Sequence, residues 1–154
     1  MSETSLLVSR IRNGTVLDHV EAGRAFMVLN ALHIKGDEGN VVSIAMNVPS
    51  KRLGKKDIIK VENRFLKPDE TNRLALISPS ATVNIIRDYK LVEKRPVTLP
   101  ESFIGIFKCP NPTCISNARE PITPEIYVIG KEPSILQCKY CARIIESEEL
   151  IAEI

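Results

Sequence analysis

The chain has 154 residues, of which 44% are hydrophobic, so it can bury one ordinary core or two small ones. It contains no apolar run of membrane-spanning length, and residues 1–5 lack the start of a signal peptide, which predicts a cytoplasmic protein. The net charge of +2 is unevenly distributed: residues 1–100 carry 16 Lys and Arg against 11 Asp and Glu, whereas residues 101–154 carry 5 against 8. The basic part therefore suits an anionic ligand, and the acidic part is a poor match for a nucleic-acid backbone.

The first third of the chain predicts a strand and then a helix. Residues 7–12 alternate in polarity and precede Asn13-Gly14, a pair that tolerates positive φ, so a first strand is expected to end at that turn. A first helix is expected over residues 21–34, because apolar residues recur there at helical spacing. The stripe consists of Ala22, Phe26, Leu29 and either Leu32 or His33.

Two strands and a second helix are expected next. The β-branched run at residues 41–46 predicts a strand, and a basic loop at 51–56 leads into a third strand over 57–63. Residues 68–70, Pro-Asp-Glu, are typical of the first turn of a helix, which Pro79 ends.

Residues 81–92 supply one long strand or two consecutive ones. The order strand, helix, strand, strand, helix, strand is that of the ferredoxin-like fold, an antiparallel sheet with two helices on one face. Residues 96–100 contain two prolines and form a short connection to a second unit, in which strands are expected at 104–107 and 126–129.

All four cysteines fall in this second unit, as Cys109, Cys114, Cys138 and Cys141. Two close pairs separated by twenty-three residues allow two loops to present four thiolates to one tetrahedral Zn²⁺. Four cysteines leave no open coordination position, so we expect one structural zinc per chain and no catalytic metal. Two disulfides are the alternative, which the close pairing and a reducing compartment disfavour, and iron in the same cage is another.

The expected fold class is therefore α+β. A ferredoxin-like amino-terminal sandwich, with an antiparallel sheet and two helices, is expected over residues 1–98. A small, β-rich, zinc-binding carboxyl-terminal domain is expected over residues 99–154, with much of its folding free energy supplied by the metal.

Polar side chains on two of the expected strands suit a small anion. Lys56, Ile58 and Lys60 point to one side of their strand, as Asn84 and Ile86 do on theirs, and the set can meet if the strands flank one another. Ammonium, amide and aliphatic groups together suit the phosphates, ribose and base of a nucleotide. Taken singly, the lysines read as solvated surface charges, and the chain has neither a phosphate loop nor a GxGxxG motif.

Five segments lie in a specific order along the chain: GTVLDHV at 14–20, NVPS at 47–50, GKKDIIKVEN at 54–63, ATVN at 81–84, and a cysteine frame with CPN at 109–111 and CIS at 114–116. Together they resemble the regulatory chain of aspartate carbamoyltransferase over nearly the whole sequence. The resemblance implies a non-catalytic subunit, and not an enzyme, that carries allosteric nucleotide control of the first committed step of pyrimidine biosynthesis. In that family CTP generally inhibits and ATP generally activates.

The resemblance also implies a nucleotide site for CTP and ATP, with UTP as a further candidate effector. Lys60 and Lys94 would hold the triphosphate, and Asp18, His19 and Asn84 would contact ribose or phosphate. The complete implied set is Val8, Ser9, Arg10, Ile11, Val16, Asp18, His19, Lys56, Lys60, Asn84, Ile86, Tyr89, Leu91 and Lys94. Ser9, Arg10 and Leu91 depart from the side chains usual in the family, which bears on effector preference more than on binding.

By the same resemblance, the zinc unit docks on the catalytic chain, and regulatory dimers formed through the amino-terminal domains bridge two catalytic trimers, with no nucleic-acid or membrane partner. For the docking interface we predict Asn111, in the proline-held loop, and Arg143, just past the last cysteine. Two other hypotheses compete. One is a zinc-ribbon nucleic-acid-binding protein, against which the lack of aromatic pairs on the expected sheet argues. The other is a scaffold whose zinc only maintains a fold.

Overall fold

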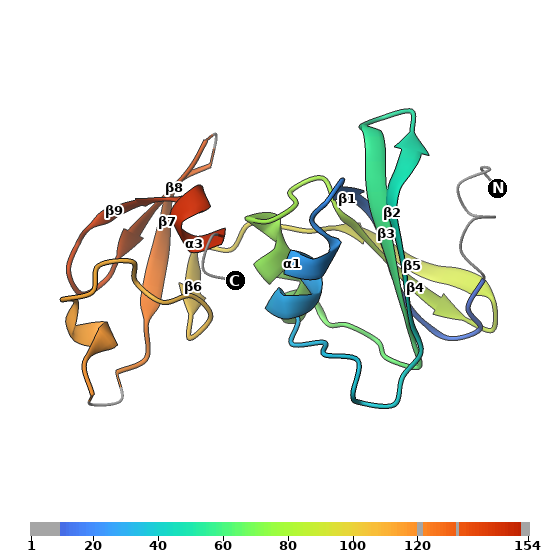
Figure 1. The fold of residues 1–154 in the computed structure, drawn as a ribbon, viewed down its shortest axis with the longest axis horizontal. Coiled ribbons are helices and arrows are strands. Elements are labelled where there is room, and N and C mark those ends of the chain that lie inside the picture. The colour runs from blue at the N-terminus through green and yellow to red at the C-terminus, as the bar shows by residue number, and fades with distance from the viewer. Residues whose placement is uncertain (1–9, 120–121, 132, 152–154) are drawn as a thin grey trace. The chain divides into compact units, whose positions relative to one another are not determined.

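A computed structural model describes residues 10–119, 122–131 and 133–151 of the chain. The chain divides between Thr98 and Leu99 into two compact units, each built on its own antiparallel sheet (Figure 1). Within the described residues, no helix is long and apolar enough to cross a membrane.

The sheet of the amino-terminal unit has five antiparallel strands in the order β2-β3-β1-β4-β5. The strands are β1 Gly14–Glu21, β2 Val42–Ser50, β3 Gly54–Glu62, β4 Thr82–Arg87 and β5 Lys90–Pro96. Helix α1 (Ala25–Ala31) and helix α2 (Pro68–Thr71), which continues as a 3₁₀ helix, η2 (Asn72–Ala75), lie on one face of the sheet (Figure 1). The order β2-β3-β1-β4 is that of the split βαβ arrangement, so the expected ferredoxin-like fold is confirmed, with β5 as an additional edge strand.

The core of this unit lies between the sheet and the helices. Leu17 of β1, Ile59 of β3 and Val83 of β4 are fully buried. Because side chains alternate along a strand, their sequence neighbours point to the opposite face of the sheet. That opposite face carries the polar residues discussed below.

The first strand follows the Asn13-Gly14 turn instead of preceding it. The strand predicted over residues 7–12 lies partly outside the described residues, and residues 10–12 are not in a strand. The prediction missed β1 because a register shift after Leu17 inserts an extra residue, which breaks the alternation of polarity along the strand.

Gly14 allows β1 to approach β3 closely. Its φ is +145°, and a Cβ at this position would lie 2.2 Å from the carbonyl oxygen of Val61. Any larger residue would separate the two strands at this point.

Both helices are shorter than the sequence predicts. Helix α1 spans Ala25–Ala31 instead of residues 21–34, and its buried face is formed by Ala25, Val28 and Leu29. Leu29 and Leu32 of the predicted apolar stripe are buried, whereas Phe26, placed in the stripe by its spacing, is 62% exposed, and Ala22 is exposed and precedes the helix.

The remaining strands of the unit also differ in extent from the prediction. Lys55 and Lys56, placed in a basic loop, belong to β3. Residues 81–92 form two consecutive strands and not one long strand: they contain β4 and the first part of β5. Asp88 and Tyr89 join the two strands, and both have a positive φ (50° and 66°), as a tight type I′ hairpin requires.

The carboxyl-terminal unit contains a four-stranded sheet in the order β6-β7-β8-β9. Its elements are β6 Ser102–Ile104, a 3₁₀ helix η3 Ile115–Asn117, β7 Glu125–Lys131, β8 Ser134–Cys138, β9 Ile144–Glu146 and helix α3 Ser147–Ile151. The rings of Phe103 and Phe107 pack edge to face, with centroids 5.1 Å apart. Strands were predicted near β6 and β7, whereas β8 and β9 were not anticipated.

Candidate metal centre and nucleotide-binding face

The four cysteine sulfur atoms converge in the carboxyl-terminal unit. Their Sγ atoms all lie within 4.8 Å of one another, and Cys109–Cys141 and Cys114–Cys138 are each 3.7 Å apart. A disulfide joins two sulfur atoms about 2.05 Å apart. Four thiolates at about 2.3 Å from a tetrahedral Zn²⁺ are about 3.8 Å from one another. The observed spacing therefore fits a tetrahedral metal site and does not fit two disulfides.

Hydrogen bonds between side chains and backbone hold the first cysteine loop. The Asn117 side-chain amide donates to the carbonyl oxygens of Cys109 (2.9 Å) and Asn111 (2.8 Å). The side-chain oxygen of Asn111 accepts from the N–H (3.1 Å) and the hydroxyl (2.9 Å) of Thr113. This loop is therefore shaped by its own hydrogen bonds as well as by any metal.

The second cysteine loop is a backbone turn. The N–H of Cys138 donates to the carbonyl of Arg143 (3.1 Å), and the N–H of Ala142 donates to the carbonyl of Cys138 (3.0 Å). Ala142 has a φ of 60°, which allows the chain to reverse directly after Cys141.

The thiols differ in acidity. Burial raises the pKa of Cys109 to about 12 and also raises the pKa of Cys138. The backbone N–H of Arg143 lowers the pKa of Cys141 to about 7. Because metals bind thiolates, metal binding displaces thiol protons, and Cys141 loses its proton most readily of these three.

In the amino-terminal unit, a row of paired residues crosses the sheet face opposite the helices. Val16 of β1 pairs with Lys60 of β3 on one side and with Asn84 of β4 on the other, and Asn84 pairs with Lys94 of β5. Directly opposed residues of antiparallel strands have Cβ atoms about 5 Å apart. The fold thus brings four of the residues in the implied nucleotide set together on one face, with β1 lying between the strands of Lys60 and Asn84.

Three more residues of that set form a contact network at the β1 bulge. The Lys56 ammonium lies 2.9 Å from the Asp18 carboxylate, and the same carboxylate oxygen accepts the backbone N–H of His19 at 2.6 Å. The Nδ1 atom of His19 lies 3.1 Å from the hydroxyl of Thr82. The network holds a carboxylate, an imidazole and an ammonium side by side.

The electrostatic environment of this face favours an anion. Burial lowers the pKa of His19, Asp18 acts against that effect, and the positive charges of Lys56, Arg52 and Lys94 lower the pKa further. Burial likewise lowers the pKa of Lys60. A bound phosphate would stabilise the protonated forms of these groups, because it would supply the negative charge that their surroundings lack.

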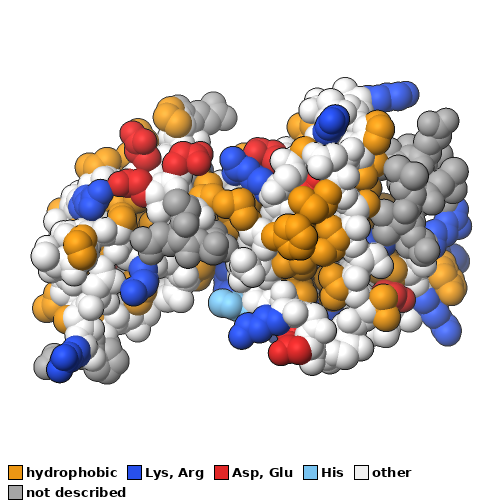
Figure 2. All heavy atoms as spheres, viewed as in Figure 1, with side chains coloured by type: hydrophobic (Ala, Val, Ile, Leu, Met, Phe, Trp, Pro, Cys, Tyr) orange, Lys and Arg blue, Asp and Glu red, His pale blue; other side chains and the backbone are white. Residues whose placement is uncertain are grey.

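Arg52 was not in the implied set. Its positive charge acts on His19, and it lies at the tip of the β2–β3 hairpin. The only sequence signal for it is the basic run that begins at Lys51. Figure 2 shows basic side chains over this hairpin tip and acidic side chains gathered on the carboxyl-terminal unit.

The other residues of the implied set have varied placements. Ile11 is buried and Arg10 is exposed, while Val8 and Ser9 lie outside the described residues. At the β4–β5 hairpin, Ile86 pairs with Leu91, and the exposed Tyr89 donates its N–H to the carbonyl of Arg12 at 2.9 Å. The hairpin tip therefore lies next to the segment that precedes β1.

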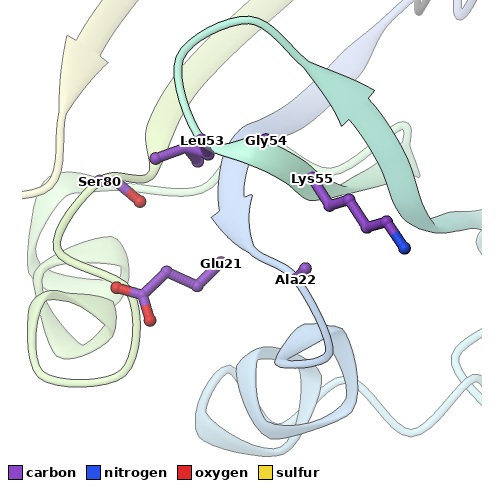
Figure 3. A pocket seen from close by; sticks show the side chains of 6 residues that line it. All are labelled: Glu21, Ala22, Leu53, Gly54, Lys55 and Ser80. Atoms are coloured by element: carbon purple, nitrogen blue, oxygen red, sulfur yellow. The ribbon is translucent and has the colours of Figure 1, made fainter.

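A separate cavity of about 560 Å³ lies where β1 ends beside the β2–β3 hairpin (Figure 3). It is lined by Glu21, Ala22, Leu53, Gly54, Lys55 and Ser80. None of these six residues belongs to the implied nucleotide set, and in Figure 3 the Lys55 side chain points away from Glu21 and Ser80.

The two predicted docking residues lie beside the metal loops. Asn111 is half-buried and its side-chain oxygen already accepts two hydrogen bonds. Arg143 is exposed and forms an ion pair with Glu149 at 2.7 Å.

Comparison with known proteins matches both units to domains of one family. Residues 6–98 match the family described as aspartate carbamoyltransferase regulatory chain, allosteric domain, and residues 101–151 match the metal binding domain of the same chain. The chain is 58% identical to the aspartate carbamoyltransferase regulatory chain of Cenarchaeum symbiosum over 146 residues, which are 95% of each chain.

Other relatives show the same extent of similarity. The regulatory chain of Nitrosopumilus maritimus is 52% identical over 150 residues, and that of Pyrococcus abyssi is 51% identical over 150 residues, with 97% of this chain and 98% of the relative covered in both cases. The metal-binding domain match agrees with the convergent cysteines. The chain therefore belongs to the family of aspartate carbamoyltransferase regulatory chains, the non-catalytic subunits of that enzyme.

Proposed function

We propose that this chain binds nucleoside triphosphates of the CTP and ATP type, with UTP as a further candidate, on the sheet face opposite its helices. The observation that carries the proposal is the row that runs from Lys60 through Val16 and Asn84 to Lys94, beside the Lys56–Asp18 ion pair. The two outer lysines suit phosphate oxygens, and Asn84 can bond ribose or base.

Calorimetric titration with CTP and with ATP tests this site. The unmodified chain is expected to bind both, and Lys60→Ala and Lys94→Ala are each expected to weaken binding about tenfold or more, because each removes a charge-assisted hydrogen bond. Lys90→Ala is the matched control, since Lys90 is an exposed lysine outside the row. Equal binding by all four proteins would contradict the proposal.

We further propose that the four cysteines bind one structural Zn²⁺ and that the metal unit docks on the catalytic chain of aspartate carbamoyltransferase. The sulfur spacing and the all-cysteine donor set fit zinc, and the relatives are named as regulatory chains of that enzyme. Asn111 and Arg143 are the proposed docking residues. Four reduced thiols in one site also fit a cytoplasmic protein.

In this proposal the amino-terminal units pair as regulatory dimers that bridge two catalytic trimers. A nucleotide that binds one quaternary state more tightly than another shifts the population between them, which is how control would reach the catalytic chain. Elemental analysis of the purified chain tests the metal. Mixing with a catalytic trimer, with and without a chelator, tests docking, and the large complex is expected only when the metal is present.

A further inference from the structure

Two β-bulges flank Asp57, one in each of the strands that pair with β3. The β1–β3 register shifts between Leu17 and Val20, and the β2–β3 register shifts between Ala45 and Val48. Bulges change the direction in which side chains point and are frequent beside functional sites. β3 is therefore bordered on both sides, at the same level, by a strand with one extra residue.

Each bulge contains a residue in the left-handed region, His19 with φ 55° and Asn47 with φ 59°. Residues other than glycine seldom adopt this conformation unless surrounding contacts maintain it. Contacts that maintain both bulges should therefore be present nearby.

Asp57 supplies such contacts. It is fully buried, and one of its carboxylate oxygens accepts the N–H groups of Gly23 (2.9 Å) and Ala25 (3.0 Å). The other oxygen accepts the N–H of Asn47 at 2.9 Å. Gly23 and Ala25 lie where β1 passes into α1, and Asn47 lies in the β2 bulge. One side chain of β3 thus bonds both the β2 bulge and the segment that leads from β1 into α1.

The residue before Asp57 acts on the opposite face of the sheet. Lys56 contacts Asp18, which together with His19 forms the β1 bulge. Because neighbouring side chains of a strand point to opposite faces, Asp57 bonds the helix layer while Lys56 faces the polar row. Asp57 therefore bonds the segment that follows the β1 bulge, and that bulge presents Asp18 and His19 beside Lys56.

We propose that Asp57 is a positioning residue for the nucleotide site. It fixes the chain where β1 meets α1, so that the extra residue of β1 has to bulge at Asp18 and His19. The bulge brings these two side chains to Lys56 and Thr82. The ligand in this inference rests on the proposed function, but the placement of His19 can be tested without any nucleotide.

The first test is Asp57→Asn, which preserves the size of the side chain and replaces one acceptor oxygen by an NH₂ group. NMR titration of His19 is the readout. The His19 midpoint is expected to move to higher pH as the imidazole becomes less buried. The dissociation constant for CTP or ATP is expected to rise about tenfold.

Thr15→Val is the matched control. Thr15 is also a fully buried polar residue of β1, and its hydroxyl donates to the carbonyl of Arg64 (2.7 Å) and accepts the N–H of Leu66 (3.0 Å). Loss of the Thr15 hydroxyl should lower the stability of the unit as well, yet Thr15 lies at the other end of β1 from the bulge. We expect the His19 midpoint to be unchanged and the dissociation constant to change less than about twofold.

A second pair of variants acts on the same hydrogen bond from the protein surface, which covers the case in which Asp57→Asn does not fold. Asn47 is exposed, so its substitution removes no core packing. Asn47→Val disfavours the left-handed conformation, so it should shift the midpoint of the His19 titration and weaken nucleotide binding about threefold. Asn47→Gly permits that conformation, so it should change neither the midpoint nor the affinity.

If Asp57→Asn shifts the His19 titration midpoint no further than Thr15→Val does, or if both Asn47 variants behave alike, the positioning role of Asp57 is overturned. If His19 shifts as expected but the unmodified chain binds no triphosphate, the role in shaping the bulge is supported and the proposed nucleotide function fails.

Discussion

The two units of this chain differ in the size of the hydrophobic core that each of them buries. Among the described residues, the amino-terminal unit has 22 buried hydrophobic residues, whereas the carboxyl-terminal unit has 10, of which three are cysteines. A unit of this size has little apolar burial for ordinary stability, and the proposed zinc would supply much of the difference. A ligand would therefore have a different structural role in each of the two units.

The proposed nucleotide would bind one face of the amino-terminal sheet, and the hydrophobic core on the other face already stabilises that sheet. The proposed zinc, in contrast, would join two loops whose cysteines are separated by more than twenty residues of sequence, so it would be part of the fold. Removing the nucleotide should accordingly leave the amino-terminal unit folded, whereas removing the metal should unfold the carboxyl-terminal unit.

Metal removal is expected to have the largest effect. Structural Zn²⁺ contributes about 10–16 kcal/mol in small zinc domains, so chelation should unfold the carboxyl-terminal unit. The amino-terminal unit should remain folded and should still bind nucleotide. Heteronuclear NMR can follow both units at once: amide resonances of residues after 98 should collapse, and those before it should persist until zinc is added back.

Cys114→Ser tests the same expectation by substitution instead of chelation. It replaces one of the four buried or half-buried cysteines proposed to bind zinc, and should reproduce the effect of the chelator without added reagents. Cooperative loss of both units would show that they do not fold separately, and an unchanged spectrum would show that the metal is dispensable.

A large-to-small substitution in the amino-terminal core should destabilise that unit and leave the carboxyl-terminal unit unchanged. Leu17 is fully buried at the centre of the sheet, so Leu17→Ala should lower the unfolding free energy of that unit by roughly 3 kcal/mol. Metal content and the resonances of the carboxyl-terminal unit should be unchanged. Urea unfolding followed residue by residue provides the measurement, and Val92→Ala, on an exposed side chain, is the control.

The pH dependence of nucleotide binding should be smaller. The pKa of His19 is below its ordinary value of about 6.5 in the free chain, mainly because of burial, and a nearby phosphate would raise it. Binding then takes up a proton, so affinity should increase as pH falls through the raised, bound-state pKa, and should level off below the lowered, free-state pKa. We expect about a three- to tenfold gain by calorimetry.

The control for this dependence is His19→Gln, which cannot titrate. It should retain only the pH dependence of the nucleotide's own phosphates. An identical profile in both proteins would remove His19 from the phosphate site.

The smallest effect on stability is expected at Arg143. Its ion pair with Glu149 is solvent-exposed, with 41% and 36% of the two side chains accessible, so Arg143→Ala should change the unfolding free energy by less than about 0.5 kcal/mol. If Arg143 contacts the catalytic chain, assembly should nevertheless weaken about tenfold in a sizing or titration experiment. Lys131→Ala, on another exposed cation of the same unit, should alter neither quantity.

The sequence was most informative where a single local pattern decided the structure. The β-branched run around Ile58 and Ile59 predicted β3, and the cysteine spacing predicted a common metal site. It was least informative where tertiary contacts override the local pattern. The bulge at His19 disguised β1, and the packing that leaves Phe26 exposed cannot be read from helical spacing alone.

For the candidate site, the sequence supplied the residues but not their arrangement. Strand parity placed Lys56 and Lys60 on one side, but only the sheet order inserts Val16 between Lys60 and Asn84. Asp57 gave no local signal, since its three hydrogen-bond donors come from residues 10 to 34 positions away.

The central place of β1 in its sheet has a consequence for synthesis on the ribosome. Gly14 pairs with Glu62 on one side and with Ile86 on the other, so β1, the first strand of the described residues, gains its second neighbour only after β4 has been translated. Pairings this distant close slowly, because a long loop must be ordered before they form. A nascent chain that stalls before β4 would leave one flank of β1 open, and such an unpaired flank is where chaperones or misassociation would act on this protein.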